Sequence, residues 1–482
     1  MLHPGRPSTL ALVGLAALAL GIRVYGLGAR DLWENEQVTL VDSLGVRLPV
    51  AEGKGRSFPS SRLHTDKGPL AIARYSASHD QPIYVTLMCL WTRLVPSSEW
   101  SLRLPSALMG ALTIPVLAVL GARLLGNRGG LWAAALLAVL PLHVSYSQEA
   151  RTYATTIFLV VLSAAVCLAV GERDDRWSWI GYGIVAATVP AFHLLAAVAL
   201  LPQGAWLLAR PGSGRRLPYA LASGFFVLCL LTPLGYGQSV ITAHRESGIG
   251  FQHPPPELRD WALPTTFSRL VSGLGATTTR LLGIEYPGFG VRARDVLWLS
   301  GPLLAAVIVA ARRMRPRKVA LFLIGAASLP LMTAAILSLG YGHIVPLQDR
   351  YSAWSMPFFA LLLGESIVRL RNSLSRLAGT ALLLTCGLFL AKMQIPAPPR
   401  TTPRAHEIER LTACALEGQV VRANDAMEAA VISSWTKGPL LLQVSADPAS
   451  SQRTAWEVEP GTGTLCRTSS GTGCDGEFPL CP

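Results

Sequence analysis

The chain has 482 residues, of which 51% are apolar and only 15% are charged, and its mean hydropathy is +0.40. An ordinary soluble domain carries about 25% charged residues, so this composition excludes a conventional soluble enzyme, a disordered chain and a small disulfide-rich protein. The net charge of +13 lies in short arginine clusters between apolar runs, not along one basic face. That pattern is typical of a multi-pass membrane protein and does not indicate nucleic acid as a partner.

Eleven apolar runs predict membrane-crossing helices, each of which needs about 20 mostly apolar residues. The first run resembles a signal peptide, but Arg23, Tyr25 and Arg30 follow it in place of a small-residue cleavage site, so we expect a membrane anchor. The fifth and sixth runs are short and share a turn around Pro190 to His193. The predicted spans are 9–27, 102–122, 131–147, 153–171, 178–191, 193–209, 218–235, 295–311, 319–339, 352–368 and 377–393. The fold class is therefore an all-α polytopic membrane protein.

The basic residues predict the orientation of these spans. The apolar run 81–95 is only 15 residues long and carries Arg93, so we expect an interfacial helix there and not a twelfth span. The short loops on the N-terminal side then hold most of the basic residues, and the short loops opposite hold only Arg151 and Arg350. The positive-inside rule places the N-terminus in the cytoplasm and the C-terminus outside, in a bacterial inner membrane. The basic residues of the cytoplasmic loops are Arg123, Arg128, Arg173, Arg176, Arg210, Arg215, Arg216, Arg312, Arg313, Arg315, Arg317, Lys318, Arg369, Arg371 and Arg376.

This topology divides the chain into a membrane domain, 1–393, and an external C-terminal domain, 394–482. The membrane domain includes two large outer loops, 28–101 and 236–294. Two short apolar runs in the tail, 418–421 and 440–444, predict a small α+β appendage. The tail also carries Cys414, Cys466, Cys474 and Cys481, an even number that favours two disulfides in an oxidising compartment. A zinc site is the alternative, and the absence of a CxxC pair disfavours it.

The first outer loop opens with acidic residues directly after the first span. Glu34 and Glu36 flank Asn35, so they would share one side of an extended segment but not of a helix. Carboxylates at a membrane surface can act as a general base toward a hydroxyl group. The alternative is a solvated loop start whose acids cap a helix.

Two arginines lie in the short outer loops, where basic residues are otherwise missing. Glu149 and Arg151 fall between the third and fourth spans, and they either pair with each other or present a polar surface to a ligand. Arg350 opposes the orientation signal, which favours a functional role over a topological one, although a pair with Asp349 is the alternative. An arginine side chain suits a phosphate because its planar fork donates two hydrogen bonds.

Weaker candidates for substrate contact are His79, Asp80 and His193, each of which has an ordinary structural alternative. Trp33, Trp91, Trp100 and Trp354 are most simply interfacial aromatic residues. The sequence has no phosphate-binding loop of the Walker type, no dinucleotide-binding glycine motif and no His-x-x-x-His pattern. It therefore gives no support to an ATPase or a zinc protease.

The order of these elements resembles the GT-C superfamily of membrane glycosyltransferases, in the branch of protein O-mannosyltransferases and lipid A aminoarabinose transferases (glycosyltransferase family 39-like). LWENEQVTL at 32–40 is similar to the LWxDExxTL pattern of that branch, and HDQPIY at 79–84 loosely matches its HPPLYY-like helix start. SEWSLRLPSAL at 98–108, SQEARTYA at 147–154 and Arg350-Tyr351 with the later Pro357 match further patterns in the same order. The likeness covers residues 9–370 and leaves the tail unexplained.

The resemblance implies an inverting transfer of a hexose or pentose from a polyprenyl-phosphate donor to a hydroxyl- or amine-bearing glycolipid or protein acceptor on the outer face. Carried over by position, Glu36 falls on the second acid of the family pair, and Asn35 replaces the aspartate. An amide cannot accept the proton, so Glu36 or Glu34 would be the base. Arg151 and Arg350 would bind the donor phosphate.

The resemblance further makes Gln148, Glu149, Tyr153, His193 and Tyr351 candidates for substrate contact. Related oligosaccharyltransferases use a divalent cation, which we do not expect here because of Asn35. Two alternatives remain: a non-catalytic relative, favoured by Asn35, and a transporter or flippase of lipid-linked sugars. A transporter is expected to carry ionisable residues near the middle of the membrane, whereas the residues singled out here lie at helix ends.

Overall fold

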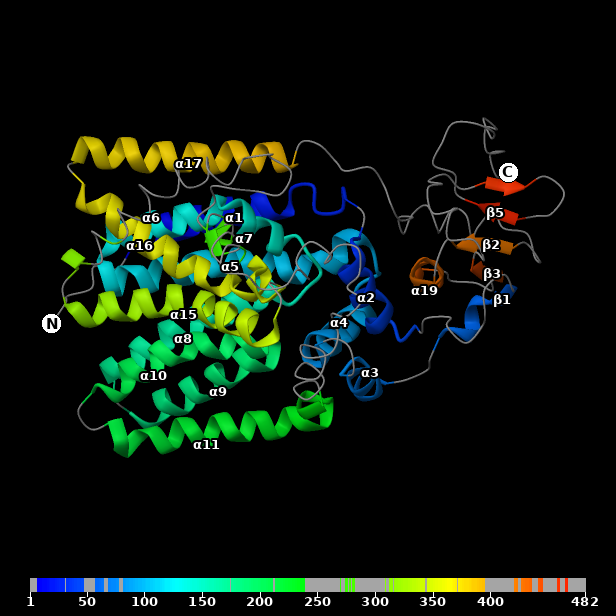
Figure 1. Cartoon of the computed structure of the whole chain (residues 1–482), viewed down its shortest axis with the longest axis horizontal. Helices are drawn as coiled ribbons and strands as arrows, with labels where there is room; N and C mark the ends of the chain where they lie inside the picture. Colours follow the sequence, from blue (N-terminus) through cyan, green and yellow to red (C-terminus); the bar gives the residue numbers. More distant parts are fainter. Residues whose placement is uncertain are drawn as a thin grey trace. The chain divides into compact units, whose positions relative to one another are not determined.

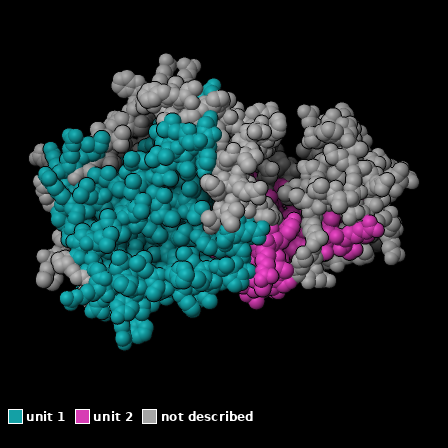
Figure 2. All heavy atoms as spheres, turned by 60° about the horizontal axis from the view of Figure 1, so that its bottom comes forward, with its two compact units in different colours: residues 1–25, 77–81, 105–396 teal, residues 26–76, 82–104, 397–482 magenta. Residues whose placement is uncertain are grey.

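The structure is a computed structural model, and it forms two compact units (Figures 1 and 2). The first unit contains residues 1–25, 77–81 and 105–396, and the second contains residues 26–76, 82–104 and 397–482. The residues that the structure describes are 7–30, 32–46, 57–64, 68–77, 81–173, 175–210, 213–238, 269, 274–275, 277–278, 280–281, 308, 312–314, 316–342, 345–370, 372–394, 420–423, 426–435, 441–444, 457–459 and 464–466.

The first unit is a bundle of apolar helices that lie side by side (Figure 1). Helix α9 packs between α8 and α11, and α6 packs against α16 and α17. The helices are α1 (Thr9–Val24), most of α5 (Glu99–Leu125), α6 (Asn127–Val139), α7 (Pro141–Ser147), α8 (Tyr153–Arg173), α9 (Arg176–Phe192), α10 (Leu201–Leu208), α11 (Ser213–Leu231), α15 (Arg317–Tyr341), α16 (Met356–Arg369) and α17 (Asn372–Gln394). Short 3-10 helices connect them: η2 (Leu194–Leu200), η3 (Thr232–Leu234), η5 (Val345–Leu347), η6 (Asp349–Tyr351) and η7 (Ala353–Ser355).

These helices agree with the predicted spans, with two local differences. The third predicted span is broken: α6 and α7 meet at an angle of 63°. The sixth begins as the 3-10 helix η2 and becomes α-helical only at Leu201. By length and hydropathy, four described helices can cross a membrane, or five if the bent α6–α7 pair is one span. The predicted span 295–311 lies almost entirely outside the described residues, so the total of eleven stays a prediction.

Small residues allow the helices of the first unit to approach one another closely. A Cβ atom at Gly364 of α16 would lie 2.6 Å from the backbone oxygen of Gly129 in α6. Only glycine fits at such a crossing, as is common between helices in a membrane, where the hydrophobic effect does not drive helix association. The core around this contact is rich in alanine and leucine, with valine, isoleucine and phenylalanine side chains, from α5, α6, α8, α15 and α16.

The second unit combines the first outer loop with the C-terminal tail. Its sheet has the strand order β1-β3-β2-β5-β4, in which β1 pairs antiparallel with β3 and β2 pairs parallel with both β3 and β5. Helix α19 connects the parallel strands β2 and β3 and packs against α2. The elements are α2 (Glu34–Ser43), α3 (Pro69–Ser76), α4 (Pro82–Leu94), α19 (Ala426–Trp435), β1 (Ser57–Pro59), β2 (Val420–Ala423), β3 (Leu441–Val444), β4 (Glu457–Glu459), β5 (Thr464–Cys466) and the 3-10 helix η1 (Ser60–Arg62).

The α+β character predicted for the tail is confirmed, and both short apolar runs form strands, β2 and β3. The unit boundaries differ from the predicted division at residue 393, because β1 of the first loop pairs with the tail strand β3 and His64 Nε2 contacts the backbone oxygen of Ser433 at 3.0 Å. The two predicted disulfides stay a prediction. Cys414, Cys474 and Cys481 lie outside the described residues, and Cys466 is described only as a residue of β5.

Candidate active site

Glu36, the predicted base, is buried in an ion pair with Arg103 in the second unit. Its side chain is only 1% exposed. Arg103 Nε donates to Glu36 Oε1 at 2.8 Å, and Arg103 Nη2 donates to Oε2 at 2.7 Å. The backbone N–H of Trp33 also donates to Oε2, at 3.2 Å, which caps the first turn of α2. Both carboxylate oxygens are therefore engaged.

Arg103 also fixes the chain that leads into this helix. Its Nη1 donates to the backbone oxygens of Leu27 and Arg30, each at 2.9 Å. One buried guanidinium thus joins Glu36 to the segment that follows the first predicted span. The sequence analysis did not predict a role for Arg103. It is the arginine of the SEWSLRLPSAL pattern, which was used only to identify the resemblance to the family.

Because the segment from Glu34 onward is helical, Glu34 and Glu36 do not share one side. Asn35 is half-buried, and its backbone oxygen accepts a hydrogen bond from Thr39 Oγ1 at 3.2 Å. The orientation of the Glu34 side chain lies outside what the structure describes, as do His79 and Asp80. Within the described residues, no three histidine, cysteine, aspartate or glutamate side chains gather to hold a metal ion.

In the first unit, the structure brings together aromatic and basic side chains from three junctions between helices. Tyr153 begins α8, His193 follows α9, and Tyr351 ends η6. The His193 ring lies 6.3 Å from the Tyr153 ring and 6.2 Å from the Tyr351 ring, between ring centroids. Trp354, only 1% exposed, packs against His193 at 4.7 Å. Trp354 is therefore a buried part of this cluster, and its interpretation as an interfacial aromatic residue was wrong.

Two arginines face the same histidine. Burial, together with the positive charges of Arg151 and Arg350, lowers the pKa of His193 to about 3. The imidazole is therefore neutral near pH 7. Its Nδ1 atom is buried and has no hydrogen-bond partner among the described residues. The surroundings of this neutral histidine are therefore positive, and one of its polar atoms has no partner among the described residues.

Arg350 keeps its charge without a carboxylate partner. Burial disfavours the cation, but the facing phenols of Tyr351, Tyr153 and Tyr146 outweigh burial, and the pKa of Arg350 lies above its usual value. The predicted alternative, a pair with Asp349, is wrong: Asp349 lies 3.7 Å from Arg280, and no described carboxylate is within ion-pair distance of Arg350. The Nε atom of Arg350 is buried and has no hydrogen-bond partner within the described chain.

The 146–153 segment brings further predicted residues to this junction. Arg151 is 9% exposed, and its backbone oxygen accepts a hydrogen bond from Ser106 Oγ at 3.1 Å. Glu149 Oε1 accepts one from Ser145 Oγ at 3.3 Å. The Nε2 atom of Gln148, a predicted substrate contact, donates to backbone oxygens at the end of α1.

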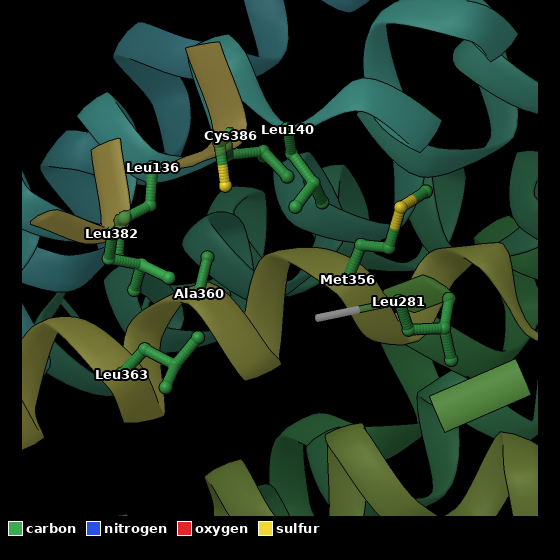
Figure 3. Close-up of a pocket in the computed structure, with 9 residues that line it drawn as sticks. Leu136, Leu140, Leu281, Met356, Ala360, Leu363, Leu382 and Cys386 are labelled. Carbon is green, nitrogen blue, oxygen red and sulfur yellow. The ribbon is translucent and has the colours of Figure 1, made fainter. Parts of the chain in front are cut away.

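A separate pocket between α6, α16 and α17 is apolar (Figure 3). It is lined by leucine side chains together with Met356, Ala360 and Cys386, and it offers no charged group. It suits neither a sugar nor a phosphate.

Comparison with known proteins adds to this geometry. Residues 79–236 match the family model described as dolichyl-phosphate-mannose-protein mannosyltransferase. That range includes Arg103, Arg151 and His193. The resemblance to GT-C membrane glycosyltransferases is confirmed. Among curated proteins, no sequence matches the chain at a significant level.

Solved structures show the same GT-C fold at low sequence identity. ArnT from Cupriavidus metallidurans bound to undecaprenyl phosphate has a TM-score of 0.51 and 16% identity over 89% of this chain and 75% of that chain. The apo state of the same ArnT gives 0.50 and 15% over 85% and 84%. The oligosaccharyltransferase of Archaeoglobus fulgidus, in complex with Zn and sulfate, gives 0.52 and 13% over 92% and 63%. At these identities the matches establish the GT-C-like fold alone.

Proposed function

We propose that this GT-C-like protein transfers a sugar from a polyprenyl-phosphate donor to a hydroxyl or amine group of a glycolipid or protein acceptor. The observation that carries the proposal is Arg350, a half-buried cation whose Nε–H is buried and has no partner, with no carboxylate within ion-pair distance among the described residues. Arg151 faces the same neutral histidine, so two guanidinium groups converge on one place. An arginine at a helix end with no carboxylate partner among the described residues, close to a second arginine, is expected to bind an anion such as a phosphate.

The chemistry of the proposed reaction needs such a site. The acceptor attacks the anomeric carbon, the bond from that carbon to the phosphate oxygen breaks, and the configuration inverts. The departing lipid phosphate gains negative charge, which Arg151 and Arg350 stabilise because their charges are already in place before the reaction. Tyr153, Tyr351 and His193 provide aromatic faces and polar atoms that suit a sugar. The lipid chain of the donor remains in the bilayer, in agreement with the membrane fold.

The proposed base is Glu34. Glu36 has both oxygens engaged by Arg103, and protonating it would leave a buried guanidinium without its counter-ion. Of the two acids that align with the family's acidic motif or flank Asn35, Glu34 and Glu36, Glu34 remains. Glu36 then holds the start of α2, the helix on which Glu34 is the first residue. We propose further that the reaction takes place at the outer face and needs no bound metal ion.

A second function is favoured by one observation. Asn35 stands where the family pattern has an aspartate, and the neighbouring Glu36 is tied to Arg103. A non-catalytic relative that binds a lipid phosphate would have the same arginine site without a working base. This alternative predicts binding of polyprenyl phosphate without sugar transfer.

The test measures release of polyprenyl phosphate from a panel of polyprenyl-phosphate sugars by the purified protein in liposomes. Arg350→Gln and Glu34→Gln are expected to abolish release, and Arg215→Gln, an exposed arginine of α11, is the matched control. Binding of undecaprenyl phosphate is measured in parallel. Release from any donor that is independent of Arg350 contradicts the proposed site, and binding without release from the whole panel supports the non-catalytic alternative.

A further inference from the structure

Arg23 is an arginine at the end of α1 with no exposed surface. No described carboxylate lies within ion-pair distance of it. Its Nη2 atom lies 2.6 Å from His143 Nδ1, and its Nε donates to Ser147 Oγ at 3.2 Å. Its Nη1 donates to the backbone oxygens of Ala19 at 2.9 Å and Ala138 at 3.2 Å. A charged side chain is costly to bury, so this contact set indicates a specific role.

The Ala138 contact explains why the cation lies at this place. Helix α6 ends at Val139, Leu140 is extended, and Pro141 starts α7, which leaves the chain bent by 63°. Proline has no N–H, and the last carbonyls of a helix have no partner within the helix. Arg23 supplies a donor to one of these carbonyls, and its positive charge suits the negative end of the α6 dipole.

Gln148 forms the reverse contact, from the end of α7 back to α1. Its Nε2 atom donates to the backbone oxygens of Tyr25 at 3.0 Å, Arg23 at 3.1 Å and Ile22 at 3.4 Å. These are carbonyls at the C-terminal end of α1, which also lack partners within their helix. Each of the two segments therefore caps the other.

We propose that Arg23 and Gln148 are positioning residues, which clamp α1 to the break between α6 and α7 and so fix the segment that carries Glu149 and Arg151. The inference rests on the proposed function, because it assigns the placement of a donor-phosphate arginine to this clamp. Gln148 then acts on the substrate only through its neighbours. His143 accepts the Arg23 hydrogen bond on Nδ1, so its proton is on Nε2.

The space between Gly110 of α5 and the clamp is filled. A side chain added at Gly110 therefore tests the clamp without changing Arg23 or Gln148. A Cβ atom at Gly110 of α5 would lie 2.0 Å from Ser147 Oγ and 3.0 Å from Arg23 Nε. Gly110→Ala is expected to push the two helices apart at the clamp. Ser147→Gly removes the obstructing side chain, so the double variant should regain part of the parent behaviour, short of the contact between Arg23 Nε and Ser147 Oγ that it loses. Gly21→Ala on α1, which meets nothing within 4 Å, is the matched control.

Two measurements test the proposal on purified full-length protein. The first is amide hydrogen exchange of peptides covering 141–153, which needs no donor. Gln148→Met and Gly110→Ala are expected to raise exchange there about tenfold, as the loss of hydrogen bonds worth about 1.4 kcal/mol predicts. The second is the KM for the lipid donor, expected to rise about tenfold while the KM for the acceptor stays unchanged. A general loss of folding would lower the active fraction and leave both KM values unchanged.

The outcomes separate the clamp from the proposed function. Unchanged exchange in Gln148→Met and Gly110→Ala overturns the clamp, and so does a Gly110→Ala defect that Ser147→Gly fails to reduce. Changed exchange with no turnover of any donor by the parent protein supports the clamp and removes the proposed function. Changed exchange with an unchanged donor KM contradicts the placement of Arg151 by the clamp. Arg23→Gln is a further variant. If Arg23→Gln fails to fold, Gln148→Met and Gly110→Ala still test the clamp.

Discussion

The ion pair between Glu36 and Arg103 separates a structural role for Glu36 from a catalytic one. Both side chains are almost fully buried, at 1% and 4% exposed. Removing either partner leaves the other charge buried without compensation, which costs about 4 kcal/mol of unfolding free energy. We therefore expect Glu36→Met and Arg103→Met each to destabilise the protein by about that amount.

The double variant should be far more stable than the sum of the two losses predicts. With both charges gone, the remaining cost is that of three backbone groups that lose their partners: the N–H of Trp33 and the oxygens of Leu27 and Arg30. At about 1 kcal/mol each, the double variant loses about 3 kcal/mol. The sum of the single losses is about 8 kcal/mol, so the expected coupling between the two residues is about 5 kcal/mol.

The assay measures unfolding in detergent micelles titrated with SDS, together with release of polyprenyl phosphate. If Glu36 is structural, the double variant releases more polyprenyl phosphate than Glu36→Met alone, although it too lacks the carboxylate. A catalytic base cannot be restored by a change at a second position. Equal inactivity of a folded double variant and of Glu36→Met would refute the structural role, and a coupling near zero would refute the energetic argument.

Three further predictions concern the arginine site and the metal question. Arg350→Gln is expected to weaken binding of undecaprenyl phosphate about 100-fold by calorimetry, since a lost charge contact costs about 3 kcal/mol; equal binding by this variant and the parent would contradict the site. His193 titrates near pH 3 in the folded protein and near 6.5 when unfolded, so the unfolded state binds more protons between these values and stability falls as pH decreases from 6.5 to 3. His193→Asn should make this fall shallower in thermal unfolding, and an unchanged slope would count against the buried neutral histidine. Release of polyprenyl phosphate is expected to persist in excess EDTA, and restoration of lost activity by Mg²⁺ or Mn²⁺ would contradict a metal-free reaction.

The fold followed from the sequence because long apolar runs and the positions of arginines report directly on a membrane environment. Local breaks were harder to predict. Pro141 lies inside an apolar run that reads as one span, and hydropathy does not register the missing N–H that bends it there. The pairing of β1 with β3 joins residues more than 380 positions apart in the chain, and no periodicity in either segment indicates the other.

The candidate site was predicted in part for a similar reason. The predicted topology pointed to Arg151 and Arg350, because basic residues are rare in the short outer loops and those that occur there are more often functional. It did not point to Arg23 or Arg103. Arg23 lies at the end of the first apolar run, Arg103 lies within a family pattern, and neither has an unusual position in the sequence.

What distinguishes these buried arginines is how many of their hydrogen-bond donors the protein itself uses. A guanidinium has five N–H donors. Arg103 uses four of them on Glu36 and two carbonyls, and Arg23 uses four on Ser147, His143 and two carbonyls. Arg350 instead retains a buried Nε–H without a partner among the described residues, and its guanidinium lies over the Tyr351 ring at 5.1 Å. An arginine that uses most of its donors in this way, here called saturated, contributes architecture, and one with a buried unused donor is available to a ligand. Since saturation depends on carbonyls brought together by folding, it is a property of the structure, and it makes Arg350 the residue whose substitution should affect the ligand before it affects the fold.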